Sequence, residues 1–158
     1  MIKRSVKILS GLLLLCISNS RAQNWTATGN IGLPRPLLSM YADSNYLYAG
    51  MQSGGSNSNN IRVWNGSQWD TLLNPCSILG GRPTCITKYQ NSIVASTDCG
   101  TVLEWTGSNW SAIGLANNGI SWLWAEANDL YAVGGFDTIG GVAASRVAKW
   151  NGTIWSAI

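Results

Sequence analysis

The chain has 158 residues, of which 46% are hydrophobic and only 11% charged, and this composition excludes an intrinsically disordered protein. It contains no histidine, which excludes Ser-His-Asp and Cys-His nucleophiles and His-ligated zinc or copper. Four of its ten basic residues, Lys3, Arg4, Lys7 and Arg21, precede residue 23; six basic residues then remain against seven acidic ones, so we expect no basic surface for nucleic acid.

Residues 1–22 have the organisation of a secretory signal peptide. Basic residues at the start are followed by an apolar run over residues 8–17, and small side chains, Ser20 and Ala22, stand at the −3 and −1 positions before Gln23. An apolar run of about ten residues is too short to cross a bilayer, which takes roughly 20. We therefore expect cleavage after Ala22, a secreted or cell-surface protein, and no membrane span after cleavage.

Two alternatives for this segment stay open. A buried N-terminal helix would need an amphipathic spacing that the apolar run lacks. A lipid anchor on Cys16 would resemble lipoprotein signals, but Leu15 stands where those signals carry a small residue.

After the signal, a motif with two tryptophans and a glycine occurs three times, as WNGSQW, WTGSNW and WNGTIW, with leading tryptophans 41 and 45 residues apart. Trp25 lies 44 residues before Trp69 and fits the second tryptophan of an earlier copy. Spacing of this kind is the signature of a repeat architecture. We interpret the six tryptophans of the motif as structural aromatics that pack between the repeated units: Trp64, Trp69, Trp105, Trp110, Trp150 and Trp155.

A second marker keeps the same order between the tryptophan pairs. The segments 45–49, 91–95 and 128–132 align without gaps, each starts with asparagine, and each follows an apolar or mixed stretch. Asparagine and glycine supply the positive backbone angles of tight hairpin turns, and the surrounding Tyr, Val, Ile and Trp favour strands. Each unit therefore reads as four antiparallel strands, and no stretch after residue 22 has a helical period.

Four short antiparallel strands repeated about every 41 to 46 residues predict the blades of a β-propeller. We expect an all-β fold in which residues 23–158 form a partial propeller, with units over residues 30–72, 73–114 and 115–158 and a lone outer strand over 23–29. Residues 120–125 are apolar on both sides of the strand, as a blade with two neighbours requires. A β-sandwich, a barrel and a β-helix are the alternatives, but they give no reason for tryptophan pairs at a fixed register.

The third unit resembles a Kelch-type blade. The residues that carry the resemblance are LYAVGGF at 130–136, IGG at 139–141 and VAKWNG at 147–152, followed by Trp155. They look like galactose-oxidase-like propellers and still more like the repeats of large secreted bacterial proteins that end in a sorting domain. The resemblance therefore implies such a domain in a full-length chain. The first two units depart from it, because Gly50-Met51 and Ser96-Thr97 replace the double glycine.

No catalytic, metal-binding or cofactor-binding residues are predicted. The copper of galactose-oxidase-like enzymes relies on histidines, the seven acidic residues are scattered, and no phosphate-binding glycine loop is present. Trp122 and Trp124 interrupt the repeat, since Tyr41 and Thr87 occupy the positions aligned with Trp124. An exposed aromatic ring can stack on a sugar, and Trp122 is our candidate for such a ligand contact.

Cys76, Cys85 and Cys99 remain after signal cleavage, and an exported protein is permitted disulfides. Cys76 and Cys85 flank a loop with two glycines and a proline, so a Cys76–Cys85 disulfide is the pairing that we favour. A Cys85–Cys99 disulfide and three free thiols are the alternatives.

Two functional hypotheses follow. The first is a non-catalytic binding or scaffold module, whose partner is an unknown protein or glycan and whose contacts lie in the variable loops at residues 52–60 and 137–145. The alternative is a fragment of a secreted carbohydrate-active or other enzyme whose catalytic residues lie outside this segment. Because propellers have about 4–8 blades, we expect a longer natural protein, or self-association through open blade edges into a six-bladed ring.

Overall fold

The computed structural model describes residues 7–9, 12–14, 36–52, 61–72 and 81–158. All regular elements in these ranges are β-strands and none is helical, which confirms the all-β prediction. The chain divides into two units, Met1–Asn30 and Ile31–Ile158. In the first unit, β1 (Lys7–Leu9) pairs antiparallel with β2 (Leu12–Leu14). The expected cleavage site after Ala22, the outer strand around Trp25 and the position of Cys76 all lie outside the described residues.

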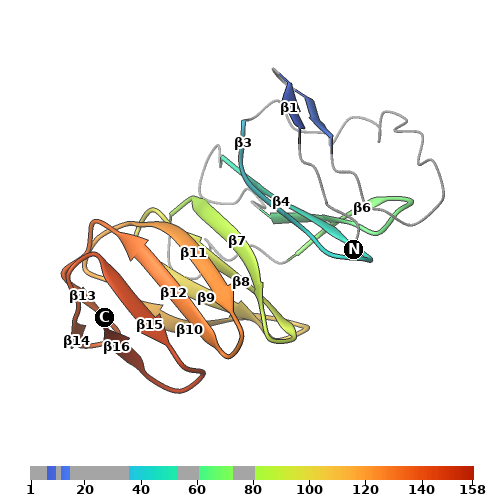
Figure 1. The fold of residues 1–158 in the computed structure, drawn as a ribbon. Coiled ribbons are helices and arrows are strands. Elements are labelled where there is room, and N and C mark those ends of the chain that lie inside the picture. The colour runs from blue at the N-terminus through green and yellow to red at the C-terminus, as the bar shows by residue number, and fades with distance from the viewer. Residues whose placement is uncertain (1–6, 10–11, 15–35, 53–60, 73–80) are drawn as a thin grey trace, which may run out of the picture. The chain divides into compact units, whose positions relative to one another are not determined.

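The second unit contains three four-stranded antiparallel sheets, each made from one continuous stretch of chain (Figure 1). The first sheet consists of β3 (Leu37–Ala42), β4 (Leu47–Met51), β5 (Ile61–Trp64) and β6 (Trp69–Thr71). The second consists of β7 (Pro83–Tyr89), β8 (Ser92–Thr97), β9 (Thr101–Trp105) and β10 (Trp110–Leu115). The third consists of β11 (Ile120–Glu126), β12 (Asp129–Gly134), β15 (Val147–Trp150) and β16 (Trp155–Ala157).

One sheet falls in each of the three expected units, and the strand register follows the sequence alignment. Leu47, Ile93 and Leu130 are each the first or second residue of the second strand, and each lies opposite the last or next-to-last residue of the first strand. Each first strand also carries a register shift near its start. Because register sets which face every side chain occupies, equivalent positions of the three sheets can be compared residue by residue.

The turns between the last two strands follow the sequence prediction, whereas those between the first two do not. Gly66, Gly107 and Gly152 all have φ of +97°, as expected for the glycine of the tryptophan motif. Between the first two strands, however, the positive φ values belong to Gln90 and Ala127, each one residue before the asparagine that we expected there. In the first sheet this turn is closed instead by a side chain at Asp43, which accepts hydrogen bonds from two backbone amides.

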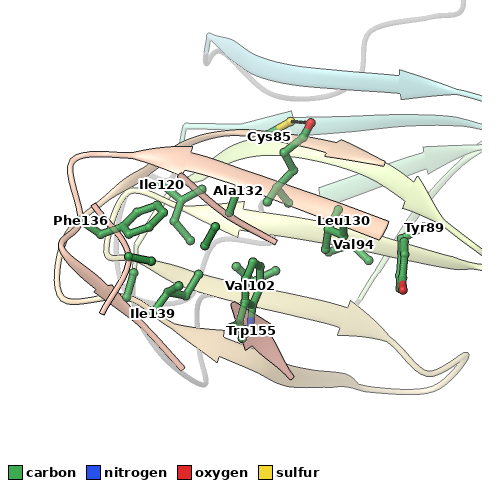
Figure 2. Packing of buried hydrophobic residues seen from close by; sticks show 14 residues of the cluster. Cys85, Tyr89, Val94, Val102, Ile120, Leu130, Ala132, Phe136, Ile139 and Trp155 are labelled. Carbon is green, nitrogen blue, oxygen red and sulfur yellow. Dashed lines mark hydrogen bonds between the residues drawn. The ribbon is translucent and has the colours of Figure 1, made fainter. Parts of the chain in front are cut away.

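The three sheets pack face to face in chain order, and the core lies between them. We call the face toward the next sheet in the chain the forward face and the opposite one the backward face. The smaller cluster joins the forward face of the first sheet, with Tyr48 and Ile61, to the backward face of the second, with Ile93 and Leu103. The larger cluster joins the forward face of the second sheet to the backward face of the third. It includes Val94, Val102, Leu130 and Trp155 (Figure 2).

Alternate residues of β8 therefore contribute to different clusters, so this strand is apolar on both faces, as residues 120–125 had suggested for a sheet with two neighbours.

The loop over residues 137–145, one of the two expected contact loops, is mostly exposed but is anchored to the core through Ile139 and Ala144. It forms a small hairpin of β13 (Thr138–Ile139) and β14 (Val142–Ala143). Ile139 is fully buried, and Phe136 at the entrance of the loop is fully buried too. Asn117 fixes this hairpin, because its side-chain oxygen accepts hydrogen bonds from the amides of residues 137 and 138. The other expected contact loop lies, apart from Gln52, outside the described residues.

Candidate functional site

The six tryptophans of the repeated motif form three cross-strand pairs on the last two strands of each sheet. In each pair the two residues lie directly opposite each other, and their ring centroids are 5.4 to 5.6 Å apart: Trp64–Trp69, Trp105–Trp110 and Trp150–Trp155. Interplanar angles of 41° to 58° give the tilted geometry that aromatic pairs prefer. Each pair thus joins the last two strands of its own sheet.

Both tryptophans of each pair are on the backward face of their sheet, and in the second and third sheets the second tryptophan reaches toward the preceding sheet. Trp110 and Trp155 are buried in the two inter-sheet clusters. The indole N–H of Trp155 also donates a hydrogen bond of 2.8 Å to the carbonyl oxygen of Ile113 in the second sheet. The indole nitrogens of Trp69 and Trp110 are buried without a hydrogen-bond partner. The same residue type thus has different polar contacts at equivalent positions.

Trp122 and Trp124 lie on the forward face of the third sheet, where side chains remain exposed. Residues alternate between the two faces of a strand, and Leu123 between them is buried against the second sheet. Trp122 and Trp124 are each 58% exposed, and Val133, the cross-strand partner of Trp122, is 40% exposed. With Tyr131, the partner of Trp124, these residues form what we call the exposed aromatic face: Trp122, Trp124, Tyr131 and Val133.

Equivalent positions in the other two sheets are covered by the sheet that follows. Cys85 is equivalent to Trp122 and Ser96 to Val133, and both are buried. In the first sheet, Gly50 is equivalent to Val133, and a Cβ atom built there would lie 3.1 Å from the side chain of Ile86 in the second sheet. The break in the repeat identified Trp122 but not Val133. The one sequence signal for Val133 is that this β-branched residue aligns with Gly50 and Ser96 in the other two units.

Charged side chains border the exposed aromatic face. The indole nitrogen of Trp124 lies 3.4 Å from a carboxylate oxygen of Glu126, to which it donates a hydrogen bond. Lys149 forms an ion pair of 3.4 Å with Asp129, whose carboxylate also accepts a hydrogen bond from the Tyr131 hydroxyl. An apolar centre with a charged border is the usual composition of a surface that contacts another protein.

A cavity of about 400 Å³ lies where the first strands of the three sheets come together. It is lined by residues 38–41 of β3, 84–87 of β7 and 122–125 of β11. Cys85 is in its wall, and the Sγ atom lies 3.6 Å from the carbonyl oxygen of Leu123. Burial raises the pKa of the Cys85 thiol, which therefore stays protonated.

The alternative Cys85–Cys99 disulfide is not formed in the described part of the chain. Cys85 is buried and Cys99 is exposed, both as free thiols, and the favoured partner Cys76 lies outside the described residues. The Cys76–Cys85 pairing stays a prediction.

An ion pair links the first two sheets next to the cavity. The ammonium group of Lys88 in β7 lies 3.2 Å from a carboxylate oxygen of Asp43, which follows β3. Burial raises the pKa of Asp43, but hydrogen bonds from the amides of Asn45 and Tyr46 and the charge of Lys88 outweigh it and leave the pKa below its usual value.

In the part of the chain that the structure describes, no three acidic or cysteine side chains gather into a metal-binding group. Nor do those residues include a helix with the length and hydrophobicity needed to cross a membrane.

No family model matches the chain, and neither does any curated protein. Two solved structures of computationally designed proteins have a similar fold. The designed Ika8 protein superposes with a TM-score of 0.50 at 17% sequence identity, over 73% of this chain and 33% of that one. The designed Ika4 protein superposes with a TM-score of 0.54 at 15% identity, over 77% of this chain and 69% of that one. The chain thus spans about a third of the first and about two thirds of the second, and the likeness concerns the fold alone.

Proposed function

We propose that the chain is a non-catalytic binding or scaffold module, secreted or held at the cell surface, whose three sheets are Kelch-like propeller blades. Three features support the blades: one four-stranded meander in each repeat unit, a tryptophan pair on its last two strands, and face-to-face packing in chain order. The signal-like organisation of residues 1–22 supports export.

The exposed aromatic face of the third sheet carries the functional part of the proposal. Two tryptophans at 58% exposure lie beside Tyr131 and Val133 on a face whose equivalents in the first two sheets are covered. Contiguous apolar surface of this kind is characteristic of an interaction site. The forward faces of the first two sheets pack against protein, so we propose that this face also binds protein. A glycan stacked on Trp122 is the alternative.

The proposal is tested by measuring how the protein is distributed between the surface of the cells that produce it and their medium, and whether it is part of a larger complex. The double variant Trp122→Ser and Trp124→Tyr installs the residues of the first sheet at both positions. We expect the wild-type protein to be retained on the cell surface or to elute in a larger complex, and the variant to appear in the medium as a single chain. Ile154→Ser is the matched control, since Ile154 is 61% exposed in the turn between β15 and β16 and is not one of the four residues of this face.

Immunoblots of cell-surface and medium fractions, each after gel filtration, give the distribution. Mass spectrometry of the N-terminus should begin at Gln23. A wild-type protein that runs as a single chain in every fraction, or that releases sugars from oligosaccharides, would contradict the proposed function.

A further inference from the structure

Three Asn-Gly dipeptides occur in the described part of the chain, at residues 65–66, 118–119 and 151–152. Asparagine followed by glycine is prone to lose its side-chain amide, because glycine carries no Cβ that hinders attack by its backbone nitrogen on the asparagine side chain. Two of the three dipeptides belong to the tryptophan motif, and the third lies in the connection between β10 and β11. The sequence alone gives no reason to rank them.

In the two motif turns, amides beyond the glycine hold the asparagine carboxamide. The Oδ1 atom of Asn65 accepts hydrogen bonds of 2.9 Å from the backbone amides two and three residues later. The Oδ1 atom of Asn151 accepts the same pair of bonds, at 2.9 and 3.0 Å. A carboxamide that turns toward its own glycine has to give up both bonds.

Asn118 is arranged differently. Its Oδ1 atom accepts a hydrogen bond of 2.7 Å from the backbone nitrogen of Gly119 itself. The carbon that this nitrogen attacks, Cγ of Asn118, is one bond from Oδ1, so the reacting groups already lie together. Asn118 is exposed, so water reaches it. Beside the carboxamide lies Gly135, where even an added Cβ atom would stay 3.4 Å from Nδ2, so the leaving nitrogen is not blocked there.

We infer that Asn118 is a site of spontaneous deamidation and isomerisation in the folded protein. The deprotonated nitrogen of Gly119 forms a bond to Cγ of Asn118, and the Cγ–Nδ2 bond breaks, with ammonia carrying away the proton. Water then opens the resulting succinimide ring. Cleavage of the bond between the nitrogen and Cγ leaves aspartate. Cleavage of the bond between the nitrogen and the main-chain carbonyl carbon leaves isoaspartate, whose main chain runs through Cβ and Cγ.

The connection around Asn118 has little room for the longer main chain of isoaspartate. A Cβ atom at Gly100, in the turn between β8 and β9, would lie 2.6 Å from the carbonyl oxygen of Asn118. The next carbonyl, that of Gly119, accepts a hydrogen bond of 3.0 Å from the amide of Gly135. β11 then begins at Ile120, which is buried. Isomerisation should therefore loosen the contact between the second and third sheets and lower the stability of the fold.

Ageing of the purified chain at mildly alkaline pH tests the site. The three dipeptides fall in separate tryptic peptides, residues 63–88, 89–146 and 150–158, and electron-transfer fragmentation distinguishes aspartate from isoaspartate. In the folded chain we expect conversion at residue 118 to be about tenfold or more faster than at residues 65 and 151, where two hydrogen bonds have to break first. In urea, where these contacts are lost, the three rates should be similar.

Two variants separate the modification from its effect on stability. Asn118→Gln keeps an amide but must close a larger ring, so it should stay unmodified and keep its urea midpoint on ageing. Asn118→Asp adds the charge without lengthening the main chain, so the fresh variant should unfold close to the fresh wild type. The aged wild type should unfold at lower urea concentration, in proportion to its isoaspartate content.

A folded chain in which residue 118 converts no faster than residues 65 and 151 would overturn the inference. So would a residue 118 that reacts in urea but stays intact in the folded chain. An unchanged urea midpoint in a sample rich in isoaspartate would overturn the effect assigned to the contact with Gly100.

Discussion

At the scale of single residues, Trp110 and Trp155 show that repeated sequence does not guarantee repeated contacts. Both rings are buried between sheets, yet only Trp155 finds a hydrogen-bond acceptor, the carbonyl of Ile113. The net contribution of a buried hydrogen bond is about 1 kcal/mol, and an acceptor left without its donor costs about 1–3 kcal/mol.

We therefore expect Trp155→Phe to lower the free energy of unfolding by about 1–2 kcal/mol more than Trp110→Phe does. The two substitutions remove similar ring area, so their difference isolates the hydrogen bond. Urea denaturation followed by circular dichroism measures both. Equal losses would mean that the bond to Ile113 contributes nothing.

The cysteines give a second test at this scale. Cys99 is exposed and Cys85 is buried against β11, so iodoacetamide should label Cys99 in the folded protein and spare Cys85. After unfolding without a reductant, peptide mapping should recover Cys76 and Cys85 as one linked peptide, because an exported chain is exposed to oxidants. Alkylation of Cys85 under those conditions would refute the predicted disulfide.

The candidate site was only partly predictable at the residue level. Trp122 was identified because it breaks the repeat, but a break in a repeat does not show which face a side chain occupies. That information comes from the register of β11 with β12, which also places Val133 beside Trp122. Val133 is an ordinary strand residue in composition, so only its exposure, against the burial of Ser96 at the equivalent position, identifies it.

At the scale of elements, a glycine in a hairpin turn shows how much its positive φ contributes to stability when no packing contact changes. Gly107 has φ of +97°, and a Cβ atom there would meet nothing within 4 Å. Gly107→Ala should therefore destabilise the protein by about 1 kcal/mol through backbone strain alone.

Gly135→Ala is the matched control for this turn. Gly135 is exposed, its φ is not positive, and an added Cβ would make only ordinary contact with Asn118 at 3.4 Å. Its effect should stay within about 0.5 kcal/mol. Thermal unfolding of the two variants beside the wild type provides the comparison, and a neutral Gly107→Ala would contradict the assigned strain.

The ion pair between Asp43, which follows β3, and Lys88 in β7 predicts that the stability of the fold depends on pH. Because the pKa of Asp43 is lowered in the folded state, its contribution to stability is present above the usual aspartate value of about 3.9 and is lost as the pH falls through the folded-state pKa. Asp43→Asn should therefore destabilise the protein at pH 7 and progressively less below pH about 4.

Urea titrations at pH 7, 4 and 3 measure that difference, and a gap that stays constant across the series would exclude Asp43 as its source. Lys88→Met provides a companion measurement. Removal of the ammonium group should raise the pKa of the Asp43 carboxyl, which carbon NMR can follow directly.

At the scale of the whole molecule, the all-β class and the position of the strands could be predicted because the tryptophan motif repeats at nearly constant spacing. The hairpin over residues 138–143 could not, since it depends on contact with Asn117 and Ala116 from the preceding connection. Most of its residues are exposed, as its loop-like composition suggests, but tertiary packing buries Ile139 and the flanking Phe136. Long-range contact of this kind has no local sequence signal.

Each four-stranded sheet draws all its strands from one stretch of chain, which only the β13–β14 hairpin interrupts, in the third sheet. A chain that emerges N-terminus first from a ribosome or an export channel can complete the hydrogen bonds of one sheet before the next sheet appears, because pairing within a sheet is local in sequence. Folding is then expected to advance one sheet at a time in the direction of synthesis. Each apolar face would wait for its cover only while about 40 further residues emerge, which limits the time for aggregation.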